Sequence, residues 1–302
     1  ANRLYSLSRD LGDPRATDEI DLIDTTRLSG AFNILDNILR ANALLASSDP
    51  QFIAPPLTIY WSERNNSRRT FFNPVTNTAY ILGDRGTDSD EFDDSVILHE
   101  YAHLLAARFS WDDSPGGLHA IGEILDPRLA WSEGWANFFS SAVRGTAIYI
   151  DSKGPGQLPL RLDLEEDSPA NDNPGYRSEA SVHGLLWDLL DENQDNVDTA
   201  QFPFASIWAA FKDLRKVRYV YLQYFLESFL ARNAGFSDTL RAMVIRRNID
   251  FQPDVRPSTM YPFPTPIVGQ TVDNVNVDSF TSKRTNLAQS TQFWSFSIPT
   301  AG

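Results

Sequence analysis

The segment that most constrains the fold of this 302-residue chain is the pentapeptide His99-Glu100-Tyr101-Ala102-His103. Its two histidines are four residues apart, and a helix places residues at this spacing on one face, where both imidazoles can converge on one metal ion. Glu100 flanks the open coordination position, where it can act as general base toward a zinc-activated water. The pattern predicts a helix that runs to about Arg108 and supplies two ligands of a Zn²⁺ ion.

Composition removes several classes of protein. The chain has no cysteine, so disulfides, thiolate ligands and cysteine nucleophiles are excluded, and any metal must be held by His, Asp or Glu. Its net charge of -14 and its lack of a basic cluster argue against nucleic acid as a partner. No stretch approaches the roughly 18 apolar residues of a membrane span. We therefore expect a soluble chain, and we expect a monomer. The opening without Met suggests a processed segment, and the cysteine-free acidic composition favours secretion.

Apolar periodicity predicts an α+β chain. A long amphipathic helix begins at Ser29, and β-prone runs at 57–61, 70–72 and 78–82 indicate a small mixed sheet with a hairpin. Downstream, helical spacing recurs at about 131–144, 181–192, 204–215, 219–233 and 238–247.

This order predicts three parts. Residues 1–109 form an N-terminal α/β subdomain that carries the helix with the pentapeptide. Residues 110–255 form a helical subdomain that supplies the third zinc ligand, and 256–302 form a proline-rich linker with short strands, a β-rich tail.

The third ligand sorts the classes of zinc hydrolase. The metzincin form needs Gly and His where this chain has Ala106 and Phe109, so that form is excluded. Glu123 and Glu133 then compete for the gluzincin form. Glu123 has the spacing of thermolysin, but Pro127 would interrupt the helix needed to aim its carboxylate. Glu133 lies in a good helical run and is preferred, which leaves Glu123 as a loop acid or a calcium ligand.

The two motifs together carry a family resemblance. His-Glu-Tyr-Ala-His followed by Glu-Gly-Trp-Ala-Asn-Phe at 133–138 resembles the paired signature of fungalysin-type metallopeptidases, relatives of thermolysin. The resemblance implies a zincin-type fold, a divergent bacterial branch, and zinc ligation by the Glu before Gly-Trp. The family typically has Asp where this chain has Asn137, whose amide can hydrogen-bond a zinc-bound His with less effect on its basicity.

A side chain that donates a hydrogen bond to the transition-state oxygen is expected further along the chain. His183 opens an apolar helix, at a place similar to that of the transition-state histidine in thermolysin-like enzymes. A carboxylate shortly before it, Glu179 or Asp172, would orient the ring. Tyr176 and Arg177 are further candidates for the same oxygen or for substrate carbonyls. The alternative for His183 is an ordinary histidine at a helix start.

Substrate contacts are expected on a sheet edge, because main-chain hydrogen bonds bind any peptide as an added strand. Asn77, Ala79 and Tyr80 resemble the edge-strand motif of thermolysin-like enzymes, although a plain hairpin strand fits equally well. His119, in a glycine-rich loop between the zinc motifs, can point at substrate or be incidental.

A second metal is also considered. Oxygen-bearing residues alternate after the helix near 181–192 as they do in calcium loops, and the alternative is a solvated acidic loop. The candidate Ca²⁺ ligands are Asp191, Asn193, Asp195 and Asp198.

The leading hypothesis is a zinc endopeptidase that acts on peptides or proteins. An aminopeptidase, a binding or adhesion module with a relict zinc site, and a zinc hydrolase of non-peptide bonds are the alternatives. Intact Glu100 argues against the module, because a structural zinc needs no base.

Overall fold

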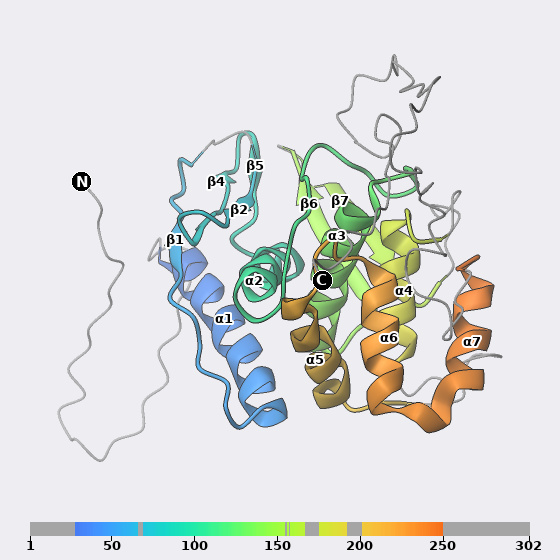
Figure 1. Ribbon diagram of the computed structural model, residues 1–302. Coiled ribbons are helices and arrows are strands. Elements are labelled where there is room, and N and C mark those ends of the chain that lie inside the picture. Colours follow the sequence, from blue (N-terminus) through green and yellow to red (C-terminus); the bar gives the residue numbers. More distant parts are fainter. Residues whose placement is uncertain are drawn as a thin grey trace, which may run out of the picture. The chain divides into compact units, whose positions relative to one another are not determined.

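A computed structural model describes residues 28–65, 69–154, 156, 158–166, 175–191 and 201–249 of the chain. In these residues seven α-helices accompany three small sheets, so the predicted α+β class is confirmed (Figure 1). The described residues divide into two compact units. The first takes in those up to Leu104 and Phe139–Leu162, and the second takes in Leu105–Phe138 and those from Asp163 onward.

The first unit contains a three-stranded mixed sheet. Its strands β1 (Thr58–Tyr60), β2 (Phe71–Asn73) and β3 (Thr78–Tyr80) lie in the order β1-β3-β2. β3 pairs in parallel with β1 and antiparallel with β2. The hairpin turn ends at Asn77, whose φ of 51° lies in the left-handed region that asparagine tolerates. The predicted mixed sheet and hairpin are therefore confirmed.

Two helices pack with this sheet in the first unit: α1 (Ser29–Ser48) and the first turns of α2 (Asp94–Phe109). Ile34 of α1, Ala79 and Ile81 of the sheet region and Ile97 of α2 form one apolar cluster, and each is 3% exposed or less. Burial of one such large side chain contributes about 1.5–3 kcal/mol. The cluster therefore fixes the beginning of α2 against α1 and the sheet.

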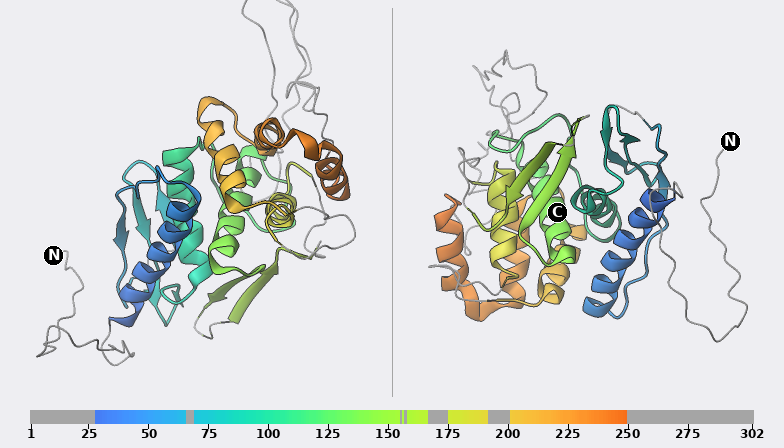
Figure 2. Two further views of the ribbon diagram at one scale, coloured as in Figure 1. Left: turned by 90° about the horizontal axis from the view of Figure 1, so that it is seen from below. Right: turned by 180° about the vertical axis from the view of Figure 1, so that it is seen from behind.

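Two further pairs of strands lie in this part of the chain. β4 (Gly83–Asp84) pairs with β5 (Asp88–Ser89), and β6 (Ile148–Lys153) pairs with β7 (Leu158–Asp163), the green ribbon in Figure 2. β5 also contacts β6. The segment that leads into α2 consequently lies beside β6.

The second unit is helical around a stack of aromatic rings. Trp135 stacks on Phe211 with ring centroids 3.7 Å apart, and Trp131 lies 5.3 Å from Phe225. These contacts hold α3, whose last turns belong to the first unit, against α5 and α6. The elements are α3 (Pro127–Arg144), α4 (Glu179–Asp188), α5 (Phe204–Asp213), α6 (Leu222–Arg232) and α7 (Ser237–Arg246), with the 3-10 turns η2 (Leu214–Lys216) and η3 (Ala234–Phe236).

A buried ion pair joins the ends of α4 and α7. The guanidinium of Arg247 donates two hydrogen bonds to the carboxylate of Asp188, and both side chains are almost fully buried. Gly184 makes room for it, because a Cβ there would lie 3.1 Å from two guanidinium nitrogens.

The predicted division at 109/110 and 255/256 stays a prediction, and the tail expected at 256–302 lies outside the described residues. Among the helices that the structure describes, none combines the length and the apolar character needed to cross a bilayer.

Candidate metal centre

Two histidines occupy one face of α2. His99 and His103 are one turn apart, and their Nε2 atoms are separated by 3.1 Å. Two imidazole nitrogens at this distance share either a proton or a cation, because two facing lone pairs repel. Elsewhere on the helix, Leu98, Ala102 and Leu105 are fully buried. This anchoring fixes the direction in which the two imidazoles point.

Polar contacts with α1 hold the same helix from its first turn. The amides of Asn33 and Asn37 donate to Oδ1 of Asp94 at 2.9 and 2.7 Å, and the negative charge of Asp94 suits a helix N-terminus. Further along, the hydroxyl of Tyr101 donates to Oδ1 of Asn42. The helix is thus held by hydrogen bonds as well as by apolar packing.

The motif Glu133-Gly134-Trp135 gives α3 three different contacts. Consecutive helical residues point about 100° apart, so the three side-chain positions face three directions. Trp135 enters the aromatic core. Gly134 faces α4 so closely that a Cβ would lie 2.5 Å from Cβ of Val182. Glu133 is left to present a carboxylate that is only 8% exposed.

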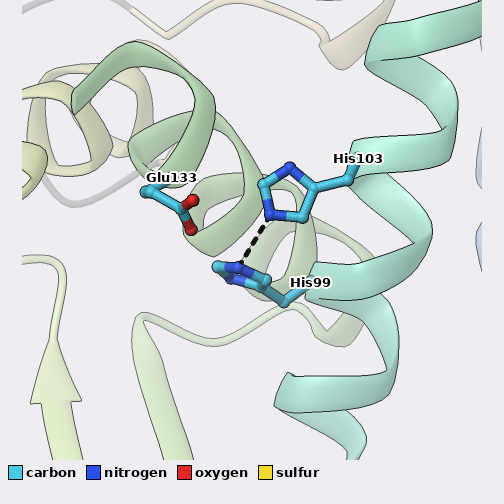
Figure 3. A group of neighbouring side chains, drawn as sticks. All are labelled: His99, His103 and Glu133. Carbon is cyan, nitrogen blue, oxygen red and sulfur yellow. Dashed lines mark hydrogen bonds between the residues drawn. The ribbon is translucent and has the colours of Figure 1, made fainter. Parts of the chain in front are cut away.

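One ligand atom from each of His99, His103 and Glu133 lies within 4.8 Å of the other two. Figure 3 shows the carboxylate of Glu133 directed toward the two imidazoles. Two nitrogens and one carboxylate oxygen form the ligand set of open zinc sites, in which a fourth position stays free for water or substrate. The residues expected to hold zinc are therefore a group that could hold a metal ion.

A chain of polar contacts continues from Glu133 within the second unit. Nε2 of His119 lies 3.4 Å from Oε2 of Glu133 and 3.7 Å from Oε2 of Glu179. Asn137 donates to Oε1 of Glu179 at 2.6 Å. Burial lowers the pKa of His119, but the hydrogen bond and charge of Glu133 and the charge of Glu179 outweigh it and raise the pKa to about 10. The two carboxylates thus favour the protonated form of His119.

Residues 45–243 match the family described as the Mycolysin C-terminal domain, a range that contains all three members of the group. The chain belongs to this family. The domain occurs in fungalysin and thermolysin-like peptidases, so membership relates the chain to metallopeptidases without establishing a catalytic activity. No curated protein matches the sequence.

His183 lies on α4 at 4% exposure, near the start of the helix as expected. Burial, followed by the positive charge of Arg247, lowers its pKa to about 3, so the ring is neutral near neutral pH. Its Nδ1 lies 3.4 Å from the amide nitrogen of Asn137. Two contacts of Asn137 lead to Glu179 and His183, and its predicted hydrogen bond to a zinc-bound histidine stays a prediction.

The remaining candidates are placed as follows. Glu100 is buried on α2 next to His99. The hydroxyl of Tyr176 donates to Gln223 at 3.0 Å, and the backbone carbonyl of Arg177 accepts from Leu125.

One neighbour of the site was not predicted from the sequence: Tyr149 of β6, whose ring meets that of His99 edge-on at 6.1 Å. The alternating pattern of β6 marks no functional role, so no sequence signal distinguished this tyrosine.

The strand that was expected to bind substrate lies in the middle of its sheet. Asn77, Ala79 and Tyr80 were predicted to form a sheet edge, but β3 is the central strand of its sheet. Ala79 is paired with Ile59 on one side and with Phe72 on the other, so the backbone there has no free side for an added strand. The structure therefore shows the hairpin-strand alternative rather than a sheet edge, and substrate binding by these residues stays a prediction.

Two other assignments concern acidic residues. Glu123 lies in a turn before α3, where its carboxylate accepts from the backbone amide of Ala120 at 3.0 Å. Of the expected calcium loop, Asp191 is described, whereas Asn193, Asp195 and Asp198 lie outside the described residues.

Proposed function

We propose that this protein is a zinc peptidase in which His99, His103 and Glu133 hold the ion. The observation that carries the proposal is the convergence of one ligand atom from each residue within 4.8 Å. Ligands about 2.0–2.1 Å from a tetrahedral zinc lie about 3.3 Å from one another. The 3.1 Å between the two imidazole nitrogens therefore fits a shared ion. The family match supports a peptidase context.

Zinc in such a site polarises the scissile carbonyl and makes water acidic enough to attack near neutral pH. Glu100 follows His99 on the same helix, and we assign it the proton of the attacking water. It would then deliver that proton to the leaving amine. Because its carboxylate is 8% exposed, the group has little bulk water around it to compete for that proton.

Two imidazoles compete for support of the oxyanion. His183 was predicted for this role, but it is buried and carries no charge near neutral pH. The side chain of His119 is 26% exposed and reaches Glu133 at 3.4 Å, which combines access for substrate with proximity to the proposed metal. We therefore propose His119 as the donor to the oxyanion and His183 as a buried partner of Asn137.

Zinc content and casein cleavage, measured on the same preparations, test this assignment. We expect about one zinc per chain, because the three ligands are all that a catalytic site requires. Glu100→Gln should keep the zinc and lose activity by about 10²–10⁴-fold, the usual contribution of a positioned general base. Glu133→Gln should lose zinc, whereas Glu123→Gln, which removes the better-spaced glutamate, should keep zinc and activity. Zinc retained by Glu133→Gln would refute the ligand set.

The same assay distinguishes the alternative functions. Zinc bound without cleavage of casein by the unchanged protein would favour a relict module or a hydrolase of non-peptide bonds. Substitution of the two histidines separates the oxyanion donors. His119→Gln should lower kcat by about 10²–10³-fold, as removal of an oxyanion donor does, with zinc retained. A larger loss of kcat in a folded His183→Gln would return the role to His183.

The zincin fold, endopeptidase action and secretion are part of this proposal. They are supported by the family match and by the two motifs, and cleavage within an internally quenched peptide blocked at both ends would test the endopeptidase assignment.

A further inference from the structure

Three aspartates of the first unit converge away from the zinc motif. One carboxylate oxygen from each of Asp90, Asp93 and Asp151 lies within 4.8 Å of the other two. They come from two places in the chain: Asp90 and Asp93 from the segment between β5 and α2, and Asp151 from strand β6. Asp88 of β5 adds a fourth carboxylate, whose charge acts on both Asp90 and Asp93.

The charges of this cluster are incompletely balanced by the contacts around it. Lys153 approaches Asp151, with Nζ 2.8 Å from Oδ2. The charge of Lys153 also acts on Asp88 and Asp90. Burial and then the neighbouring aspartates raise the pKa of Asp90 to about 7, although a hydrogen bond from Thr70 opposes the shift.

One buried oxygen points to a ligand. Asp90 is 3% exposed, and its Oδ2 accepts a hydrogen bond from Thr70. Its Oδ1 is fully buried and has no hydrogen-bond partner. A buried polar atom without a partner costs about 1–3 kcal/mol, more when it is charged. One oxygen of this carboxylate also lies within 4.8 Å of oxygens of Asp93 and Asp151, so a cation bound among the three would compensate the buried charge.

We propose that Asp90, Asp93 and Asp151 bind a calcium ion. The donors are all oxygens, which suit hard cations, whereas zinc prefers nitrogen and sulfur. Two segments far apart in the sequence supply them, an arrangement that tolerates the irregular geometry and high coordination number of Ca²⁺ better than the strict octahedron of Mg²⁺. The site is distinct from the acidic loop after α4.

The position of the cluster gives the ion a structural role. Ser152 of β6 already donates its backbone amide and its hydroxyl to Asp93, at 2.9 and 2.7 Å. The amide of Ile150 on β6 also donates to Oγ of Ser95 in the first turn of α2 at 3.0 Å. A cation would add a further connection between β6 and the beginning of α2. The same strand carries Tyr149, which meets His99 on α2. Calcium would therefore stabilise the part of the first unit that positions the two zinc ligands.

Calcium titration of the full zinc-loaded chain, after dialysis against chelator-treated buffer, tests the proposal. Calorimetry should detect a Ca²⁺ site, and excess calcium chloride should raise Tm by roughly 5–10 °C, as expected for a ligand well above its Kd in a protein of this size. Asp151→Asn, at a partly exposed position where folding is least at risk, should abolish most of this rise. Both readouts are independent of peptidase activity, so they can fail or succeed separately from the zinc proposal.

Two further variants sharpen the result. Asp191→Asn should keep the full calcium effect, and Lys153→Gln should bind Ca²⁺ more tightly because a competing positive charge is removed. No change of Tm with calcium, a full rise in Asp151→Asn, or a rise lost in Asp191→Asn would each overturn the proposal. It would also fail if Lys153→Gln lowered Tm equally with and without calcium and left the affinity unchanged. An equal effect of magnesium chloride would refute the choice of calcium.

Discussion

Substitution of Gly134 by alanine tests why α3 can carry both a metal ligand and a core tryptophan. Alanine in place of glycine inside a helix gains about 1 kcal/mol of propensity. Against this, the new Cβ would lie 2.5 Å from both Cβ and Cγ1 of Val182 and 3.0 Å from the carbonyl oxygen of Glu179. Separations under 3.0 Å require the neighbours to move, and Val182 is fully buried and β-branched, so no flexible side chain can yield.

Overpacking of this kind costs about 1–3 kcal/mol or more, and the two close contacts place Gly134→Ala at the upper end. After the gain in propensity, we expect a net loss of about 2 kcal/mol, which lowers Tm by about 4–8 °C for a domain of this size. Urea unfolding followed by circular dichroism measures the loss directly. Because Glu133 precedes the substituted residue, displacement of α3 should also weaken zinc binding.

Gly235 provides the matched control. A Cβ there meets no atom within 4 Å, so Gly235→Ala adds the same methyl group in open space. Its stability should be unchanged or slightly higher, since alanine restricts the unfolded chain. If Gly134→Ala proved as stable as the unchanged protein, the close approach of α3 and α4 would not explain the glycine of this motif.

Two further predictions concern buried charge in the second unit. His183 has a pKa lowered to about 3 in the folded state, against 6.5 when unfolded. The unfolded state therefore binds the proton first, and stability is lost as pH falls from 6.5 toward 3. At 1.36 kcal/mol per unit this loss reaches about 3 kcal/mol near pH 4, and it should be absent in His183→Gln when urea unfolding is compared at neutral and acid pH. A steep acid loss in that variant would contradict the assignment. Arg247→Met leaves the buried carboxylate of Asp188 without its two hydrogen bonds and should cost about 3–5 kcal/mol in the same assay. The double variant with Asp188→Leu should recover most of that cost, and a double variant as unstable as the single one would show that packing, rather than charge, is responsible.

Local chemistry explains what the sequence could predict. The spacing of His99 and His103 specifies a helix whatever lies elsewhere in the chain, because one turn alone relates the two side chains. Pro127 was predicted to interrupt a helix after Glu123, and it is instead the first residue of α3, a position where a missing amide costs nothing. The same property that favours proline there leaves Glu123 in the preceding turn and Glu133 within the helix.

Pairing between distant segments of the chain explains what the sequence could not predict. The residues around Ala79 have the composition of an edge strand, and only the parallel addition of β1 makes that strand central. The acidic run from Asp88 to Asp94 has the composition of a helix start, which accounts for Asp94 but not for Asp90. Asp90 acquires its unpartnered oxygen on burial, and its pKa is raised by burial and then by Asp88 and by Asp151, which lies on the distant strand β6. The burial and the neighbours of such a carboxylate depend on the fold rather than on the adjacent sequence. The proposed calcium site can therefore be recognised only in the folded structure.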